Sequence, residues 1–333
     1  MKKSTCLPIF FSILLSVQAQ HKPVNENATE EARMLLDYIY SLNGRIMAGQ
    51  HSYNENPSSF YDKAQKISGK APAVWGTDFY WNGEDDPGDR IVQEAIKKHQ
   101  EGAIITLMWH VGQPKHDPPF HWRESVQGEI SEKEWIDLLT PGSVLYQRWA
   151  TQVDQVAVHL KKLQEAKIPI LWRPYHEMNG VWFWWGDKKG KNGFAKLWKQ
   201  LYDRLVNHHQ LNNLIWVWNA NGPRDIPGDQ AYDYKNYYPG QKYVDILATD
   251  VYHGDYEQKD YGQLLKLAKK KPIALGEVGQ LPRTLILEAQ PKWSWFMVWS
   301  NWIETANSPE RVKDVYQYEK TITRDEVHSV YQH

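Results

Sequence analysis

Eight short apolar runs recur along the chain, and each is followed by a segment of different character. The runs cover residues 45–48, 71–75, 103–109, 168–174, 213–218, 244–248, 272–276 and 295–299. Helical periodicity is clearest between them at residues 91–99, 145–165, 194–208 and 261–270. Strands that alternate with helices predict a parallel sheet. Eight such units in one domain predict an α/β fold, the (β/α)8 TIM barrel.

The N-terminal residues have the pattern of a secretory signal peptide. Lys2 and Lys3 precede an apolar run at residues 7–17, and Val17-Gln18-Ala19 supplies a small-residue cleavage site. We therefore expect residues 1–19 to be a signal peptide cleaved after Ala19, and the protein to be secreted or periplasmic. The run is too short for a transmembrane span, so the mature chain is expected to have none.

Residues 20–333 are expected to form one catalytic barrel domain, because no repeat, low-complexity tract or linker marks a second one. The single cysteine, Cys6, lies within the predicted signal peptide. A mature chain without cysteine excludes disulfides, a thiol nucleophile and a cysteine-ligated metal.

The balance of charges excludes two classes of partner. There are 39 basic and 40 acidic side chains, and the net charge is -1. This composition has no electrostatic footprint for nucleic acid or an anionic membrane. The 17 Trp and 19 Tyr are more informative. Aromatic rings stack on the C–H faces of sugars, although they also fill protein cores, so a carbohydrate ligand is one interpretation of this composition.

Polar and aromatic side chains gather where the predicted strands end. The most concentrated stretch is residues 171–186, L-W-R-P-Y-H-E-M-N-G-V-W-F-W-W-G. The carboxyl ends of barrel strands build the active site in this fold. In this chain those ends carry His110, His176, Glu177, Asn219, Asp250, Tyr252, Glu277 and Trp299. The alternative is an ordinary core strand with an Arg–Glu pair at its end and aromatics that fill the core.

Glu177 and Glu277 follow the fourth and the seventh predicted strand, which lie across a barrel from one another. Two carboxyl groups that face each other across a sugar are the minimum apparatus of most glycosidases. One must be protonated to donate to the departing oxygen, and the other must be ionised to attack the anomeric carbon. The pair therefore favours a glycosidase over a structural role.

A catalytic metal and a serine triad are the rival interpretations. His110, His176 and the glutamates are possible zinc ligands, but no H-E-x-x-H motif is present. His176 and Glu177 are adjacent, so they would point to opposite faces of a regular strand and share a site only if it ends near Tyr175. No G-x-S-x-G motif supports a triad. We expect neither a metal nor a cofactor.

The block W-R-P-Y-H-E-M-N-G-V-W-F-W-W-G at residues 172–186 resembles glycoside hydrolase family 26, whose best-known members are β-mannanases. Other segments resemble the family in the same order: A-G-Q-H at 48–51, T-L-M-W-H at 106–110, W-V-W-N at 216–219, D-V-Y at 250–252 and G-E-V-G at 276–279. Together they cover most of the mature chain.

The resemblance implies that Glu177 is the general acid/base and Glu277 the nucleophile. It further implies substrate-binding roles for His110, His176, Trp182, Asp250, Tyr252 and Trp299. An arginine follows the last tryptophan in at least one mannanase of the family. Ser300 stands there in this chain, so contacts in the outer subsites do not carry over.

The function implied is a mannan endo-1,4-β-mannosidase that retains anomeric configuration and acts, as a monomer, on β-mannan polysaccharide or manno-oligosaccharides. An exo-acting mannobiohydrolase or another β-glycan hydrolase of the family is the alternative enzyme. The long connections at residues 111–143 and 220–241 decide between mid-chain and chain-end attack. A sugar-binding barrel without activity is the alternative outside enzymes, and the presence of both glutamates argues against it.

Overall fold

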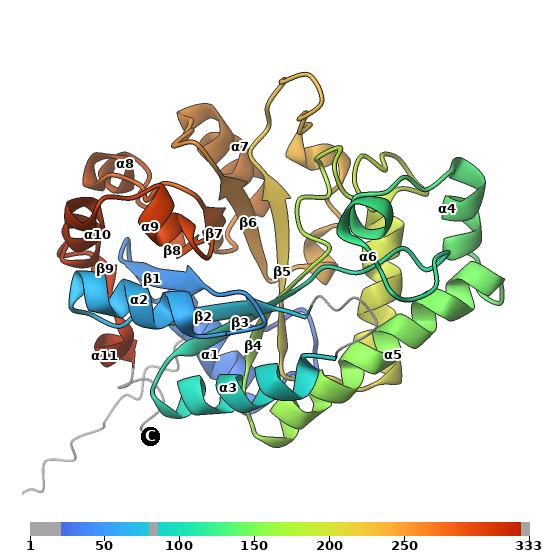
Figure 1. Cartoon of the computed structure of the whole chain (residues 1–333), viewed down its shortest axis with the longest axis horizontal. Coiled ribbons are helices and arrows are strands. Elements are labelled where there is room, and N and C mark those ends of the chain that lie inside the picture. Colours follow the sequence, from blue (N-terminus) through green and yellow to red (C-terminus); the bar gives the residue numbers. More distant parts are fainter. Residues whose placement is uncertain (1–20, 80–85, 328–333) are drawn as a thin grey trace, which may run out of the picture.

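The computed structural model describes residues 21–79 and 86–327, which form a closed parallel barrel with helices around it (Figure 1). The strands are β1 Ile46–His51, β2 Val74–Asp78, β3 Ile104–Trp109, β4 Ile170–Pro174, β5 Leu214–Asn221, β6 Ile246–Val251, β7 Ile273–Val278 and β8 Trp293–Val298. They pair in sequence order and β1 pairs with β2, which closes the ring. The short β9, Thr321–Ile322, pairs with β1 outside it. The predicted TIM barrel is confirmed.

Each predicted strand is present, but several continue past the apolar run that predicted them. Strand β5 extends to Asn221, where Asn219 and Asn221 pair with Ala248 and Asp250 of β6. Backbone pairing does not depend on the polarity of the side chain, so the ladder persists into the polar residues. The sequence pattern therefore located the strands and placed several of their carboxyl ends too early.

The helices lie around the outside of the strands, except α1, whose buried face packs against the inner core of the barrel (Figure 1). Their bounds are α1 Glu30–Tyr40, α2 Ser59–Ser68, α3 Gly88–Gln100, α4 Glu132–Leu138, α5 Val144–Glu165, α6 Phe194–Tyr202, α7 Gln258–Ala268, α8 Thr284–Ala289, α9 Trp302–Thr305, α10 Pro309–Tyr316 and α11 Arg324–Val327. Two π-helices, η1 Trp122–Val126 and η2 Asp203–His208, and two 3-10 turns, η3 Tyr234–Asn236 and η4 Gln241–Tyr243, complete the elements.

Successive side chains along each strand point alternately into and out of the barrel, which creates an inner and an outer apolar core. In β5, Ile215 and Val217 point into the barrel, and Trp216 and Trp218 point out toward the helices. The inner core also includes the buried face of α1, which packs against the inward-facing strand residues. All residues of the eight barrel strands are buried, as expected for a parallel sheet covered on both faces.

Most of the tryptophans belong to this core and do not face a ligand. The fully buried ones are Trp75, Trp109, Trp149, Trp172, Trp184, Trp185, Trp198, Trp216, Trp218 and Trp295. Two of them come from the aromatic cluster of residues 182–185, which the sequence analysis placed at the mouth of the site. The high tryptophan content is therefore mainly a packing feature.

Within the described ranges, no helix has the length and apolar character needed to cross a bilayer. The predicted signal peptide, residues 1–19, lies outside the described residues, and its removal stays a prediction.

Two glycines, one exposed in a helix and one enclosed in a strand, allow a matched test of how tightly their surroundings are packed. Gly262 is exposed within α7, and an added Cβ would meet nothing within 4 Å. Alanine is the better helix former, so Gly262→Ala should raise the free energy of unfolding by about 0.5–1 kcal/mol in urea denaturation. Gly76 in β2 is the counterpart, because its Cβ would lie 2.8 Å from Met297 Sδ and 2.9 Å from Thr106 Cγ2.

Gly76→Ala should lower the free energy of unfolding by about 1–3 kcal/mol, as overpacking does. Equal effects of the two substitutions would contradict the described packing of β2 and α7.

Candidate active site

A cleft of about 390 Å³ opens at the carboxyl end of the barrel. It is lined by His110, Trp122, Gln127, His176, Glu177, Trp182, Phe183, Asn221, Arg224, Asp229, Tyr252, His253, Glu277 and Trp299. Seven of the eight predicted site residues are in this set. The eighth, Asp250, is buried beneath the cleft, as described below.

His176 and Glu177 reach the same cleft because the chain leaves the β conformation at the end of β4. Strand β4 ends at Pro174, and both Tyr175 (φ 49°) and Glu177 (φ 56°) adopt the left-handed conformation. The backbone N–H of Glu177 then donates to the carbonyl of Asn219 at 2.8 Å. Left-handed backbone in residues other than glycine is strained and persists where its surroundings fix it, typically at functional sites. The condition that the sequence analysis set for these two residues is met.

Glu277 enters the cleft through a β-bulge. Ala248 and Thr249 pair with Ala274 and Leu275, but Asp250 pairs with Glu277, so Gly276 is an extra residue in β7. A bulge next to a site re-aims the following side chain. Gly276 is also required sterically, because a Cβ there would lie 1.6 Å from Asn219 Oδ1.

Both carboxyl oxygens of Glu177 accept hydrogen bonds. The side-chain amide of Asn221 donates to Oε1 at 2.6 Å, and the indole N–H of Trp182 donates to Oε2 at 2.6 Å. Burial raises the pKa of Glu177, and these two donors oppose the shift. Glu177 is thus held in one orientation in surroundings that favour its protonated form.

Arg224, on the connection after β5, supports both of these donors. Its guanidinium donates to Asn221 Oδ1 at 2.5 Å and lies 4.9 Å from the ring centroid of Trp182. Asp229 fixes it in turn, accepting from Nη2 at 2.7 Å and from Nε at 2.9 Å. We refer to Arg224 and Asp229 as the loop clamp.

Glu277 has a different set of neighbours. Tyr252 donates its hydroxyl to Oε2 at 2.8 Å, and Arg173 Nη2 and His176 Nε2 lie 3.5 Å and 3.6 Å from Oε1. Burial is the main reason that the pKa of Glu277 rises to about 7, and the charge of Glu177 adds to the rise, whereas Arg173 and the Tyr252 hydroxyl oppose it. Arg173 therefore lies beside Glu277, and it is not among the groups that shift the pKa of Glu177.

A buried polar layer lies beneath the two glutamates. Arg173 Nη1 donates to Asn219 Oδ1 at 2.8 Å, and Asn219 Nδ2 donates to Asp250 Oδ1 at 2.8 Å. Asp250 is 1% exposed, and burial together with the charges of Glu277 and Glu177 raises its pKa well above the usual range. In this position Asp250 contacts the supporting layer instead of the open cleft.

His110 and Trp299 also line the cleft, and each is held by a second side chain. Asp78 accepts from the backbone N–H of His110 at 3.0 Å and lies 2.7 Å from its Nδ1. His51 stacks on Trp299 with ring centroids 4.0 Å apart, and Ser300 Oγ lies 2.8 Å from His51 Nδ1. One face of the Trp299 ring is therefore covered.

Metal ligation remains a geometric possibility for one group in the site. Ligand atoms of His176, Glu177 and Asp250 all lie within 4.8 Å of one another. Both oxygens of Glu177 and Oδ1 of Asp250 already accept hydrogen bonds, and these donors compete with an ion. The expectation of a site without metal stays a prediction.

The sequence analysis missed Asn221, Arg224, Asp78, His51 and Trp122 as site residues. Asn221 had a detectable signal, because it lies two residues beyond Asn219 and so on the same face of an extended β5. Asp78 also ends a strand, β2. Arg224 and Trp122 lie on long connections, where periodicity carries no information about position.

Replacing Glu277 tests the burial of its carboxyl group. Because its folded pKa is raised, the native state keeps a proton that the unfolded chain releases, so stability falls as pH rises from about 4.5 through about 7. Gln cannot ionise and can still accept from Tyr252. Glu277→Gln should therefore gain about 1–3 kcal/mol of unfolding free energy over the wild type at pH 8, and little at pH 4.5.

Urea denaturation at the two pH values measures the difference, and Glu288→Gln is the control because Glu288 is exposed on α8. The free energy of unfolding of Glu288→Gln should stay within about 0.5 kcal/mol of the wild-type value at both pH values. A Glu277→Gln protein that is less stable than wild type at pH 8 would contradict a raised pKa.

Comparison with known proteins places this cleft in a family. The model of glycosyl hydrolase family 26 matches residues 24–326. A mannan endo-1,4-beta-mannosidase of Thermothelomyces thermophilus is 37% identical over 91% of this chain, which spans 62% of that protein's length. A Piromyces mannan endo-1,4-beta-mannosidase A is 30% identical over 92% of the chain, which spans 50% of its length.

Two solved structures are similar over nearly their full length. GH26A from Muricauda sp. MAR_2010_75 is 85% identical, with a TM-score of 0.90 over 91% of this chain and 99% of that one. A β-mannanase from a symbiotic protist of the termite Reticulitermes speratus, complexed with gluco-manno-oligosaccharide, is 28% identical, with a TM-score of 0.79 over 92% and 97%. The chain belongs to glycosyl hydrolase family 26.

Proposed function

We propose that this protein is a mannan endo-1,4-β-mannosidase that hydrolyses β-1,4-mannosidic bonds of mannan, glucomannan or galactomannan with retention of configuration. The observation that carries the proposal is the pair of buried glutamates, Glu177 after β4 and Glu277 in β7, which line one cleft. The names of the family relatives support the choice of mannan, and the termite protist enzyme binds a gluco-manno-oligosaccharide.

In the first step, a Glu277 oxygen attacks the anomeric carbon as Glu177 gives its proton to the glycosidic oxygen. The bond between that oxygen and the anomeric carbon breaks, and the reducing-end part of the glycan leaves as an alcohol. In the second step, Glu177 accepts a proton from water, the water oxygen attacks the anomeric carbon, and the bond to Glu277 breaks. Two inversions give net retention, for which carboxyl groups about 5–5.5 Å apart are required.

The neighbours of the two glutamates suit these roles. Burial raises the pKa of Glu277 to about 7, and Arg173 and the Tyr252 hydroxyl oppose this rise and so favour the ionised form that a nucleophile needs. For Glu177 burial dominates, the neutral donors Asn221 and Trp182 follow, and the charge of Arg224 opposes the rise in pKa less strongly than they do. An acid that loses its proton only at raised pH is the form required for the first step.

Trp299, Trp182, His110 and His176 are proposed as the sugar contacts. The Trp299 ring is backed by His51 on one face, so stacking on a sugar uses the other face. Trp182 donates its indole N–H to Glu177, and the Arg224 guanidinium lies against its ring. Trp182 therefore shapes the cleft beside the proton donor, on the side from which the leaving group departs.

The remaining parts of the proposal rest on sequence alone. Export through a signal peptide at residues 1–19, to the periplasm or outside the cell, is supported by the basic start and the apolar run. The protein is proposed to act as a monomer.

The two glutamates are distinguished by the leaving group of the substrate. Glu177→Ala should lose about 10²–10⁴-fold of its activity on mannan, because the departing sugar oxygen needs a proton. An activated dinitrophenyl mannoside needs no such help, so this variant should still form the glycosyl-enzyme and then stall. Azide should enter the vacated space and release a β-glycosyl azide, detectable by NMR.

Glu277→Ala, which lacks the proposed nucleophile, should be inactive on both substrates, and any azide product should be the α-anomer. The conservative Glu277→Gln protein serves as a folding control because it is expected to be stable. An α-azide from Glu177→Ala with a β-azide from Glu277→Ala would exchange the two roles. Full activity of either variant on mannan would refute the proposal.

Endo action predicts a characteristic product pattern. Cleavage within the chain should lower the viscosity of a galactomannan solution sharply while few reducing ends have appeared, and early products should span several lengths. Time-resolved chromatography of the products measures this. Mannobiose as the sole early product, with slow loss of viscosity, would identify the exo-acting mannobiohydrolase instead.

A further inference from the structure

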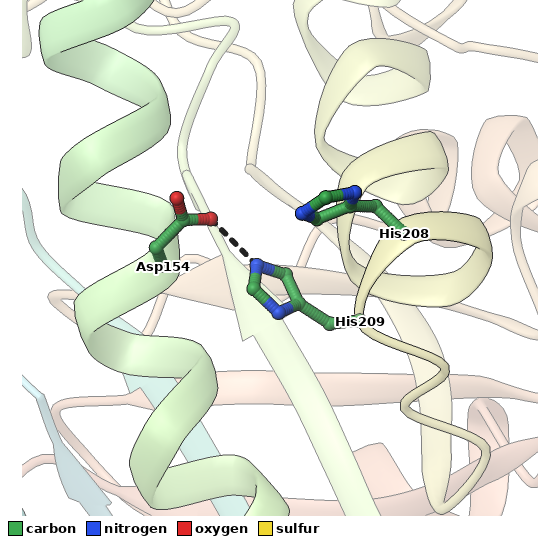
Figure 2. A group of neighbouring side chains, drawn as sticks. All are labelled: Asp154, His208 and His209. Atoms are coloured by element: carbon green, nitrogen blue, oxygen red, sulfur yellow. Dashed lines mark hydrogen bonds and ion pairs between the residues drawn. The ribbon is translucent and has the colours of Figure 1, made fainter.

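Two neighbouring histidines and an aspartate converge on the outer side of the barrel, away from the residues that line the cleft. Asp154 lies on α5, His208 ends the π-helix η2, and His209 follows it. One ligand atom from each lies within 4.8 Å of the other two. In Figure 2 the three side chains point toward one another, with Asp154 on one side and the histidines on the other.

The wide turn of η2 explains why the polar groups meet. The backbone N–H of His209 bonds to the carbonyl of Arg204, five residues back, at 3.0 Å. Both side chains then face Asp154 across the interface between η2 and α5, and His209 contacts it (Figure 2). His209 Nε2 lies 2.6 Å from Asp154 Oδ1, and the rings of His208 and His209 have centroids 4.8 Å apart at 84°.

We propose that Asp154, His208 and His209 form a binding site for a zinc ion that joins η2 to α5. Two imidazoles and one carboxylate are a donor set suited to zinc and poorly suited to magnesium or calcium, which prefer oxygen ligands. Water from the solvent completes a tetrahedron, because His208 is exposed and Asp154 and His209 are partly exposed.

Arg204 already binds both oxygens of Asp154 and therefore affects how zinc can coordinate. Its Nε donates to Asp154 Oδ1 at 2.7 Å and its Nη2 donates to Oδ2 at 2.6 Å. Zinc on Oδ1 replaces the hydrogen that His209 shares with Asp154, and the neutral ring keeps its hydrogen on Nδ1. The Arg204 Nε–H must also leave Oδ1 for the ion to bind, whereas Nη2 keeps its hydrogen bond to Oδ2 and orients the carboxylate, as outer-shell partners of metal sites do.

The charge of Arg204 opposes a dication, so the proposal predicts a moderate affinity and not that of a closed structural site. Ligand atoms bonded at about 2.0–2.2 Å to zinc lie farther apart than the present 2.6 Å between Asp154 and His209. Small rotations of the side chains open this pair and bring His208 closer. Because binding joins two elements of the native state alone, zinc should also stabilise the fold.

Isothermal titration of the full mature chain with zinc chloride tests the proposal directly. We expect one equivalent to bind, and the affinity to fall about tenfold or more in His208→Ala and in His209→Ala. His208→Ala is the sharper variant because it leaves the contacts of Asp154 with both Arg204 and His209 in place. His121→Ala is the control: His121 is exposed and outside the group, so binding should be unchanged.

The group His176, Glu177 and Asp250 in the cleft is the competing location for the ion. A zinc-edge anomalous map of crystals soaked in zinc distinguishes the two, and a peak between Asp154 and the histidines is expected. Zinc should likewise raise the thermal midpoint of the wild type and of His121→Ala, but not of His208→Ala. A peak in the cleft alone, or equal binding by wild type and His208→Ala, would overturn the proposal.

Discussion

Arg173 is the buried cation whose charge acts on two buried carboxyl groups, Asp250 and Glu277, and both of these also experience the charge of a third, Glu177. A buried charge is costly unless it is paired and hydrogen-bonded. One guanidinium cannot compensate three carboxylates, so the group keeps protons at pH values where exposed carboxyls have lost them. Glycoside hydrolysis needs a protonated acid beside an ionised nucleophile, and the shortage of positive charge in this layer supports that division.

The barrel must close before this layer exists. Arg173 comes from β4, Asn219 from β5, Asp250 from β6 and Glu277 from β7, so each hydrogen bond of the layer joins different strands. At the same level the regular backbone ends: β4 passes into left-handed residues and β7 contains a bulge. Rigid strands hold the charges, and local irregularity turns the two glutamates into the cleft.

These irregularities mark what the sequence could and could not predict. Apolar runs identified all eight strands, because burial on both faces leaves a clear pattern. The same period-two rule, with Ala274 and Gly276 facing inward, would turn Glu277 outward, and only the bulge reverses this. The position of Glu277 at the end of a predicted strand, and then the family resemblance, placed it in the site, whereas strict period-two alternation would not have done so. Asn221 was missed because the apolar run of β5 stops before the strand does, and the tryptophan-rich composition overstated the aromatic surface available to a sugar.

The acid and the nucleophile depend on different parts of the structure. Glu277 is held by residues of the barrel strands and by Tyr252, which follows β6 directly. Glu177 is held by Asn221 and Trp182, and both rest on Arg224 of the connection after β5. That connection also supplies the cleft wall, so a change in its conformation alters the surroundings of the proton donor and the leaving-group side together. The side chains that contact Glu277 belong to the barrel strands or follow them directly, so none of them comes from that connection.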